Sequence, residues 1–221
     1  QERVVRETAE KLAVEGDADG PTAEKELDIE GTISDTCNNA GNLKLRYKNP
    51  RKNAIKLLLL MDSGGSMDWY NGICNMLFQA ATKTNYFKEL HTYYFHNCIY
   101  ETMYTDPRMR MQDGVSTEWI LNNYSSEYKV IIVGDAAMNP YEIVEHRYDW
   151  RNKTYQQYSG MEWLERFKAQ YRYLIWLNPE PLPQYRNFWS QTHLDLAQKF
   201  KMYDLSVDGL EQGIKALMAR K

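Results

Sequence analysis

Two stretches of the chain are almost continuously apolar, "IKLLLL" (55–60) and "YKVIIVG" (128–134). An apolar run without alternation is typical of a parallel strand that is buried on both faces of its sheet. A similar segment, "RYLIWLN" (172–178), predicts a further strand, which ends before Pro179. These runs therefore predict a sheet whose central strands are covered by helices on both sides.

Apolar positions at spacings of three and four residues fill the intervals between the runs. The first predicted helix follows a glycine turn and has the apolar positions Ile73, Met76, Leu77, Ala80 and Ala81. The second has Met161, Trp163, Leu164 and Phe167. "SVDGLEQGIKALMARK" (206–221) predicts a third helix, in which Asp208 and Glu211 have the spacing of a capping box. Pro140 is expected at the first turn of a short helix.

Two strands are expected to run antiparallel. "LHTYYFH" (90–96) and "CIYETMY" (98–104) lie so close together that only a tight turn at Asn97 can join them. With strands and helices otherwise alternating, the chain predicts an α/β fold with a doubly wound, mostly parallel sheet and one antiparallel edge strand.

The first 24 residues differ in character from the rest. "ERVVRETAEKLAVE" (2–15) suits an amphipathic helix, and "GDADGPTAEKE" (16–26) is polar and rich in turn residues. We therefore expect residues 1–24 to form a helix and a partly mobile linker, and residues 25–221 to form one domain, with "NLKLRYK" (42–48) alternating as a strand. "GDADG" lacks the later acidic ligands of a calcium loop.

Composition excludes several classes of function. The formal net charge is −3 for 221 residues and no basic stripe stands out, which argues against a nucleic-acid binder. Three widely spaced cysteines (Cys37, Cys74, Cys98) contain no C-x-x-C pair, which indicates neither a disulfide framework nor a zinc knuckle. The longest apolar run, "AIKLLLLM", is too short to span a bilayer. We expect a cytoplasmic protein that is not inserted in a membrane.

Candidate chemistry lies at the ends of the predicted strands. Asp62 follows the first apolar run and Asp135 follows the second, and the carboxyl ends of parallel strands open onto the crevice where ligands bind. Ser66 lies in the loop after Asp62, and Thr117 at the start of a predicted helix. Carboxylate and hydroxyl oxygens are the ligands that magnesium prefers. These four residues are therefore a candidate magnesium site, with the "MNPYE" loop as one wall.

Other interpretations of the loop "DSGGS" (62–66) remain open. It lacks the spacing of a phosphate-binding P-loop and of a serine-nucleophile elbow. An aspartyl-phosphate hydrolase, in which Asp62 would be the nucleophile, requires a second aspartate where this chain has Gly64. The loop could also be only a strand-to-helix turn that Asp62 or Ser66 caps. A separate metal site at His96 and Cys98 competes with a turn-stabilising role for His96 and Asn97.

Several segments together resemble a known family. "LLLLMDSGGSMD" resembles the start of a von Willebrand factor A (VWA) domain, whose metal-ion-dependent adhesion site opens with aspartate-x-serine-x-serine. Over residues 25–219 the chain is similar to the CoxE-like branch of these proteins. The segments that carry this likeness are "KELDIEGTISDTCNNAG", "FKELHTYYFHNCIYE", "STEWILNNY", "YKVIIVGDAAMNPYEI", "WLNPE" and "VDGLEQGIKALM".

The resemblance implies a metal site at Asp62, Gly64, Ser66, Thr117 and Asp135. Gly64 replaces the usual first serine, which implies a lower affinity for Mg²⁺, Mn²⁺ or Ca²⁺, or an extra water in that position. Ser63 is out of register with the motif, and Ser116 is a lesser rival to Thr117.

The resemblance also implies a function. Such domains are binding modules and not enzymes, and an acidic side chain of a protein partner often completes the metal shell. CoxE-like proteins are associated with MoxR-type AAA+ ATPases and with the maturation of other proteins. Two alternatives stay open: a magnesium-dependent phosphohydrolase that uses Asp62, and a metal-free scaffold whose adhesion site has decayed.

Overall fold

The structure is a computed structural model, and it describes residues 26–27, 47–48, 55–83, 87–149 and 153–219. The predicted helix at 2–15, the linker that follows it and the boundary at residue 24 lie outside the described residues. Of the predicted strand at 42–48, the structure describes β2 (Tyr47–Lys48), which pairs antiparallel with β1 (Glu26–Leu27).

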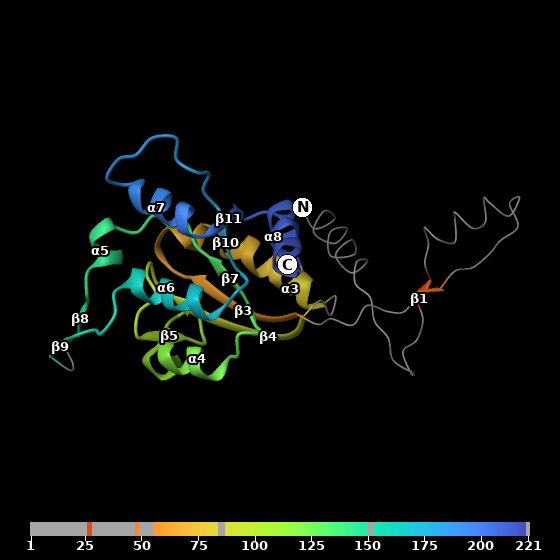
Figure 1. Ribbon diagram of the computed structural model, residues 1–221, viewed down its shortest axis with the longest axis horizontal. Coiled ribbons are helices and arrows are strands. Elements are labelled where there is room, and N and C mark those ends of the chain that lie inside the picture. The colour runs from red at the N-terminus through yellow and green to blue at the C-terminus, as the bar shows by residue number, and fades with distance from the viewer. Residues whose placement is uncertain (1–25, 28–46, 49–54, 84–86, 150–152, 220–221) are drawn as a thin grey trace, which may run out of the picture.

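A seven-stranded sheet forms the centre of the described chain, in the order β11-β10-β7-β3-β4-β5-β6 (Figure 1). Its strands are β3 (Ile55–Asp62), β4 (Phe87–Phe95), β5 (Thr102–Tyr104), β6 (Gly114–Ser116), β7 (Lys129–Val133), β10 (Leu174–Asn178) and β11 (Lys201–Asp204). The strands from β11 to β4 pair in parallel. The predicted α/β fold with a mostly parallel sheet is confirmed.

The antiparallel strand is β5, which is shorter than the segment 98–104 that the sequence predicts. Asn97 makes the tight turn with a φ of 56°, but residues 98–101 do not pair in the sheet, except for an isolated bridge between His96 and Cys98. Cys98, Ile99 and Tyr100 are buried in the core instead, because the chain crosses the carboxyl end of the sheet before it returns as β5. β6 pairs outside β5 and forms the edge.

Helices cover both faces of the sheet (Figure 1). They are η1 (Gly65–Trp69), α3 (Asn71–Lys83), η2 (Met111–Asp113), α4 (Thr117–Asn123), α5 (Pro140–Val144), α6 (Gly160–Gln170), α7 (Gln191–Lys199) and α8 (Val207–Met218). Leu57 and Leu59 of β3 pack with side chains of α3 and α8, whereas Leu58 and Leu60 pack with those of α4 and α6. Burial of alternate residues on opposite faces explains why this strand is continuously apolar.

Two details of the predicted helices are wrong. Among the residues of α3 whose burial is described, Cys74, Leu77 and Phe78 are buried, whereas Ile73 and Met76 are exposed; Ala80 and Ala81 lie outside these residues. In α8 the N-cap is Ser206, whose Oγ accepts a hydrogen bond from the N–H of Gly209 at 3.0 Å, and Asp208 lies in the first turn. A serine preceding the first turn caps in this way because it satisfies an otherwise unpaired N–H.

Parallel pairing brings the carboxyl ends of β4, β3, β7 and β10 to one edge of the sheet. Met61 pairs with Val133 and Asp62 with Phe95, so the residues that follow these strands emerge side by side. The loop after β3, the segment after β7 that leads to α5, and the long loop between β10 and α7 all leave from this edge. A short hairpin of β8 (Tyr148–Asp149) and β9 (Thr154–Tyr155) lies between α5 and α6 in the chain.

We predict that Gly209→Ala destabilises the protein by about 2–4 kcal/mol, because a Cβ there would lie 2.0 Å from the carbonyl oxygen of Asp204 and force α8 away from β11. Gly72→Ala in α3 is the matched control, since a Cβ there meets nothing within 4 Å and is expected to stabilise by about 0.5–1 kcal/mol. Urea unfolding measures both changes. Equal effects of the two substitutions would contradict the close approach of α8 to β11.

Candidate functional site

Two buried aspartates lie side by side at the carboxyl edge of the sheet. Asp62 ends β3, and Asp135 lies two residues after β7, the neighbouring parallel strand. Their residues are only 4% and 6% exposed. Gly134 permits the close approach of these two chain segments, because a Cβ at this position would lie 3.2 Å from the Cβ of Asp62. The two carboxylates are close enough that the charge of Asp135 raises the pKa of Asp62.

Ser66 is the third member of this cluster, and it contacts Asp135. Its hydroxyl donates a short hydrogen bond to Oδ2 of Asp135. The other oxygen of Asp135, Oδ1, accepts from the N–H of Ala137 at 3.0 Å, and Oδ1 of Asp62 accepts from the N–H of Asn97 at 3.0 Å. Backbone donors therefore fix Oδ1 of each carboxylate, and Oδ2 of Asp135 accepts from the hydroxyl of Ser66.

The loop between Asp62 and Ser66 has a backbone shape that favours glycine. Gly64 has φ 89° and ψ 170°, and Gly65 has a φ of 60°. L-residues rarely adopt these conformations, because their Cβ atom meets the adjacent carbonyl groups. Ser63 is turned away from the aspartates, since its hydroxyl donates to the carbonyl of Pro107 at 3.0 Å. Neither residue 63 nor residue 64 thus offers a hydroxyl to the cluster.

Thr117 is fully buried at the first position of α4, and the described contacts do not join it directly to the other three residues. Its hydroxyl donates a short hydrogen bond to the carbonyl of Tyr100, and its N–H donates to the carbonyl of Glu101 at 2.9 Å. Ser116, one residue earlier, is the N-cap of α4 and accepts from the N–H of Trp119. Among the described contacts, the connection of Thr117 to Asp62 is therefore indirect. Thr117 bonds to Tyr100, and the segment that contains Tyr100 begins at Asn97, whose N–H bonds to Asp62.

The pKa of Asp62 is raised to about 7, mainly by burial and also by the charges of Asp135 and Glu142, while hydrogen bonds from the backbone of Asn97 and Ser63 lower it. Among the described ion pairs, none joins Asp62 or Asp135 to a basic side chain. Ionising both carboxylates in this environment is costly without a compensating positive charge.

Further polar residues hold this cluster, and the sequence predicted only the turn at Asn97 and the "MNPYE" wall, which contains Glu142. Asn178, which ends β10, donates from Nδ2 to the carbonyl of Asp135 at 2.9 Å, and the same nitrogen lies 3.1 Å from Nε2 of the buried His193. Glu142 of α5 accepts from Nδ2 of Asn97 at 3.3 Å. The sequence contained a signal for Asn178, because it is a polar residue at the end of an apolar strand, as Asp62 is.

The described residues do not support a metal site at His96 and Cys98. Nδ1 of His96 lies 2.9 Å from the carbonyl oxygen of Ser63, and Cys98 is buried against Gly160. Within the described ranges, no three side chains of His, Cys, Asp or Glu come together in a group able to hold a metal. A cation beside Asp62 and Asp135 would therefore need hydroxyl, backbone or water oxygens to complete its shell.

We predict that Asp62→Asn is more stable than the wild type above pH 7 in metal-free buffer, by on the order of 2–4 kcal/mol. The folded pKa of Asp62 is raised to about 7, so its stabilising contribution is complete below the unfolded value near 4 and is lost as the pH rises through 7. Asparagine keeps the oxygen that accepts from Asn97. Urea unfolding at pH 4.5 and 8 measures the difference.

The matched control for this substitution is Asp204→Asn, at the exposed end of β11. It is expected to change stability equally at both pH values. A constant effect of Asp62→Asn across the pH range would show that burial does not perturb this carboxyl group.

We predict that Gly64→Ser and Gly64→Ala destabilise the metal-free protein by a similar amount, about 1–2 kcal/mol, because each introduces a Cβ at φ 89°. Chemical unfolding of both variants measures this cost. A serine variant clearly more stable than the alanine variant would mean that the added hydroxyl finds a partner in the cluster and that the loop tolerates the family motif.

Comparison with known proteins identifies the family. The family model described as "VWA domain containing CoxE-like protein" matches residues 2–116, slightly more than half of the 221-residue chain. The match includes Asp62 and Ser66 and ends immediately before Thr117. No curated protein and no solved structure matches the chain. The family match and the sheet of mostly parallel strands agree with each other, and the chain belongs to the VWA-domain-containing CoxE-like proteins.

Proposed function

We propose that this protein is a metal-ion-dependent protein-binding module that acts in the cytoplasm as an adaptor and not as an enzyme. The proposal is carried by one observation, the pair of buried carboxylates at the carboxyl edge of the sheet with no basic side chain paired to either among the described residues. VWA domains generally mediate protein interactions. None of the helices in the described part of the chain has the length and hydropathy needed to span a bilayer.

The residues present fit a hard divalent cation, with Mg²⁺ first and Mn²⁺ or Ca²⁺ as alternatives. Asp62, Ser66 and Asp135 would hold it, because their side chains offer only oxygen ligands. Ser66 is hydrogen-bonded to Asp135, and Asp135 is close enough to Asp62 for its charge to raise the pKa of Asp62. Thr117, at the start of α4, would contribute by holding the carbonyl of Tyr100, in the segment that supports Asp62. Glycine at position 64 leaves one fewer hydroxyl than the family motif, so we expect modest metal affinity.

A bound cation supplies positive charge and open coordination positions that attract a carboxylate. The chain's own residues then determine how the charge is presented. Asn97 and Ala137 orient the two carboxylates through their N–H groups, and Asn178 holds the carbonyl of Asp135. Because these supports come from the segments after β4 and β7 and from the end of β10, the arrangement is set by the fold before any partner arrives.

Binding is favoured over catalysis by the surroundings of Asp62. A phosphohydrolase with Asp62 as nucleophile would need a second acidic residue two positions later, and Gly64 occupies that position. The nearest described histidines have other contacts, His96 with the carbonyl of Ser63 and His193 with Asn178. General acid–base catalysis requires such a group within hydrogen-bonding reach of the reacting atoms.

The partner that we propose is a protein that offers an acidic side chain to the metal. A MoxR-type AAA+ ATPase, acting with this chain in the maturation of another protein, is the specific candidate that the family resemblance suggests. A carboxylate of the partner would fill the coordination position that the missing hydroxyl leaves to solvent.

We predict that Mg²⁺ and Mn²⁺ bind the intact protein at one site at pH 7.5 and raise its melting temperature, and that Asp62→Asn weakens this binding by at least about tenfold, because it removes a charged ligand. Isothermal titration calorimetry and thermal melting measure both effects, with Asp204→Asn as the matched control. A wild-type protein that gives neither heat nor a thermal shift with either ion would overturn the metal-dependent proposal in favour of a metal-free scaffold.

A further inference from the structure

A cavity of about 280 Å³ lies between α5, α6 and α7, and neither Asp62 nor Asp135 lines it. Its apolar lining comes from Pro140, Tyr141, Ile143, Val144 and Met161. Asp195 of α7 also lines it. α5 begins five residues after Asp135, so the cavity adjoins the loop that leads away from the carboxyl edge of the sheet.

The mouth of the cavity carries large apolar side chains that face solvent. Tyr141 is 60% exposed and Val144 is 56% exposed. The ring of Tyr141 lies 6.0 Å from that of Phe188, whose ring in turn lies 5.1 Å from that of the exposed Trp189. Single apolar residues on a surface are ordinary, but a contiguous group beside a cavity is typical of an interaction site.

A buried hydroxyl without a partner lines the same cavity. Thr192 of α7 is 2% exposed, and its Oγ1 makes no hydrogen bond among the described residues. Buried polar atoms are almost always paired, because an unpaired one loses its hydration without compensation. Oγ1 itself has less than 1 Å² of accessible surface, so it adds an unpaired polar atom to the wall of the cavity and not a contact point for a bound molecule.

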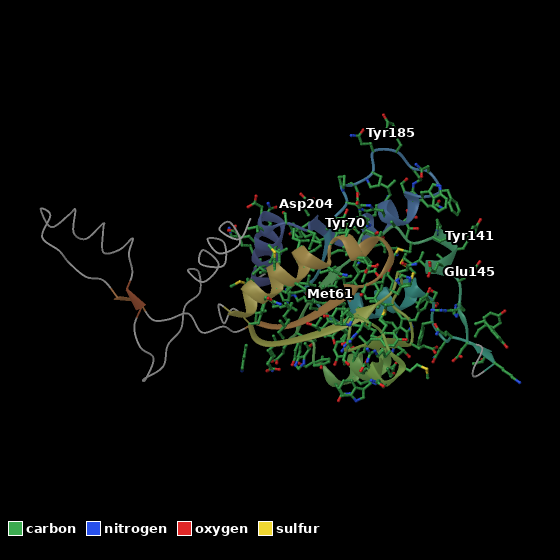
Figure 2. All side chains as sticks on the ribbon, turned by 180° about the vertical axis from the view of Figure 1, so that it is seen from behind. Met61, Tyr70, Tyr141, Glu145, Tyr185 and Asp204 are labelled. Carbon is green, nitrogen blue, oxygen red and sulfur yellow. The ribbon has the colours of Figure 1, made fainter. Side chains whose placement is uncertain are left out.

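One negative charge with no described ion pair, on Glu145, lies close to the cavity in the chain, directly after α5. Figure 2 shows Tyr141 and Glu145 projecting outward from the α5 region, on the part of the molecule that also carries Tyr185. Glu145, directly after α5, is exposed and has no ion pair among the described residues, and Asp195 is paired with Arg186. A partner with a basic side chain near Glu145 would be attracted, whereas an acidic one would be repelled.

We propose that this cavity is a docking site for a segment of a protein partner that inserts one leucine- or phenylalanine-sized side chain between α5, α6 and α7 and places a lysine or arginine beside Glu145. The site uses none of the residues proposed to hold the metal, so it goes beyond the proposed function and does not depend on it.

The test selects random peptides displayed on phage against the intact protein in buffer with EDTA. Peptides that also bind Val144→Asp are discarded, because that substitution puts a charge at the mouth of the cavity. We expect the enriched peptides to combine a large apolar residue with lysine or arginine. Failure to enrich any such peptide, or enrichment of acidic peptides, would overturn the proposal.

Synthetic copies of the best peptide then measure the contribution of single residues by fluorescence anisotropy. We expect Val144→Asp to weaken binding by about tenfold or more, and Glu145→Lys to weaken it severalfold. Glu127→Lys, an exposed glutamate before β7 at the opposite edge of the sheet, is the matched control and should bind as the wild type does. Equal binding by Val144→Asp would overturn the proposal, provided thermal melting shows that the variant is folded.

Size-exclusion chromatography with light scattering distinguishes the other occupant, a second copy of this chain. A wild-type protein whose mass is unchanged by Val144→Asp agrees with a partner segment. A wild-type dimer that Val144→Asp converts to a monomer would overturn the proposal, because the cavity would then be filled in the protein alone. Since every arm is performed in EDTA, failure of the metal site leaves these results unaffected.

Discussion

The parallel pairing of β3 with β7 is the constraint on which the candidate site depends. It places Asp62 beside Gly134, and therefore places two carboxylates in one buried corner where neither is neutralised by a described basic side chain. Burial removes hydration from these groups, and the charge of Asp135 repels that of Asp62, which together raise the pKa of Asp62 to about 7. The two carboxylates stay together despite this unfavourable free energy, because β3 and β7 cannot separate without exposing the core. Packed helices cover both faces of these strands.

Much of the fold could be predicted from the sequence because its central strands carry an unambiguous signal. The run at 55–60 is apolar without interruption at its centre, and the structure buries alternate residues of it on opposite faces. The signal is weaker where burial does not require regular pairing. Residues 98–100 resemble a strand because they are apolar or aromatic, yet they pack in the core without pairing along the sheet.

The candidate site divides in the same way. Asp62 and Asp135 could be placed from the sequence because their positions follow from strand ends, which the register of a parallel sheet brings together. Thr117 could not be placed in this manner, because its position depends on the irregular path from Asn97 to Tyr100. At position 64 the sequence shows only that a hydroxyl of the family motif is missing. The structure adds the physical reason for glycine there, a backbone conformation that other residues rarely adopt.

These features together bear on how a partner would be held. A metal site with two aspartates and few hydroxyls close by has fewer protein ligands than the family motif, and a cation held loosely gives a partner's carboxylate only a modest hold. A second contact of different chemistry changes that balance, because two weak contacts made by one molecule act at high effective concentration once the first has formed. The cavity beside α5 is suited to this role, since α5 begins five residues after Asp135 and the proposed docking there would rest on apolar burial and not on the charge of the metal. The carboxyl edge of the sheet and α5 would then act as one surface, in which the metal contributes orientation and the cavity contributes affinity.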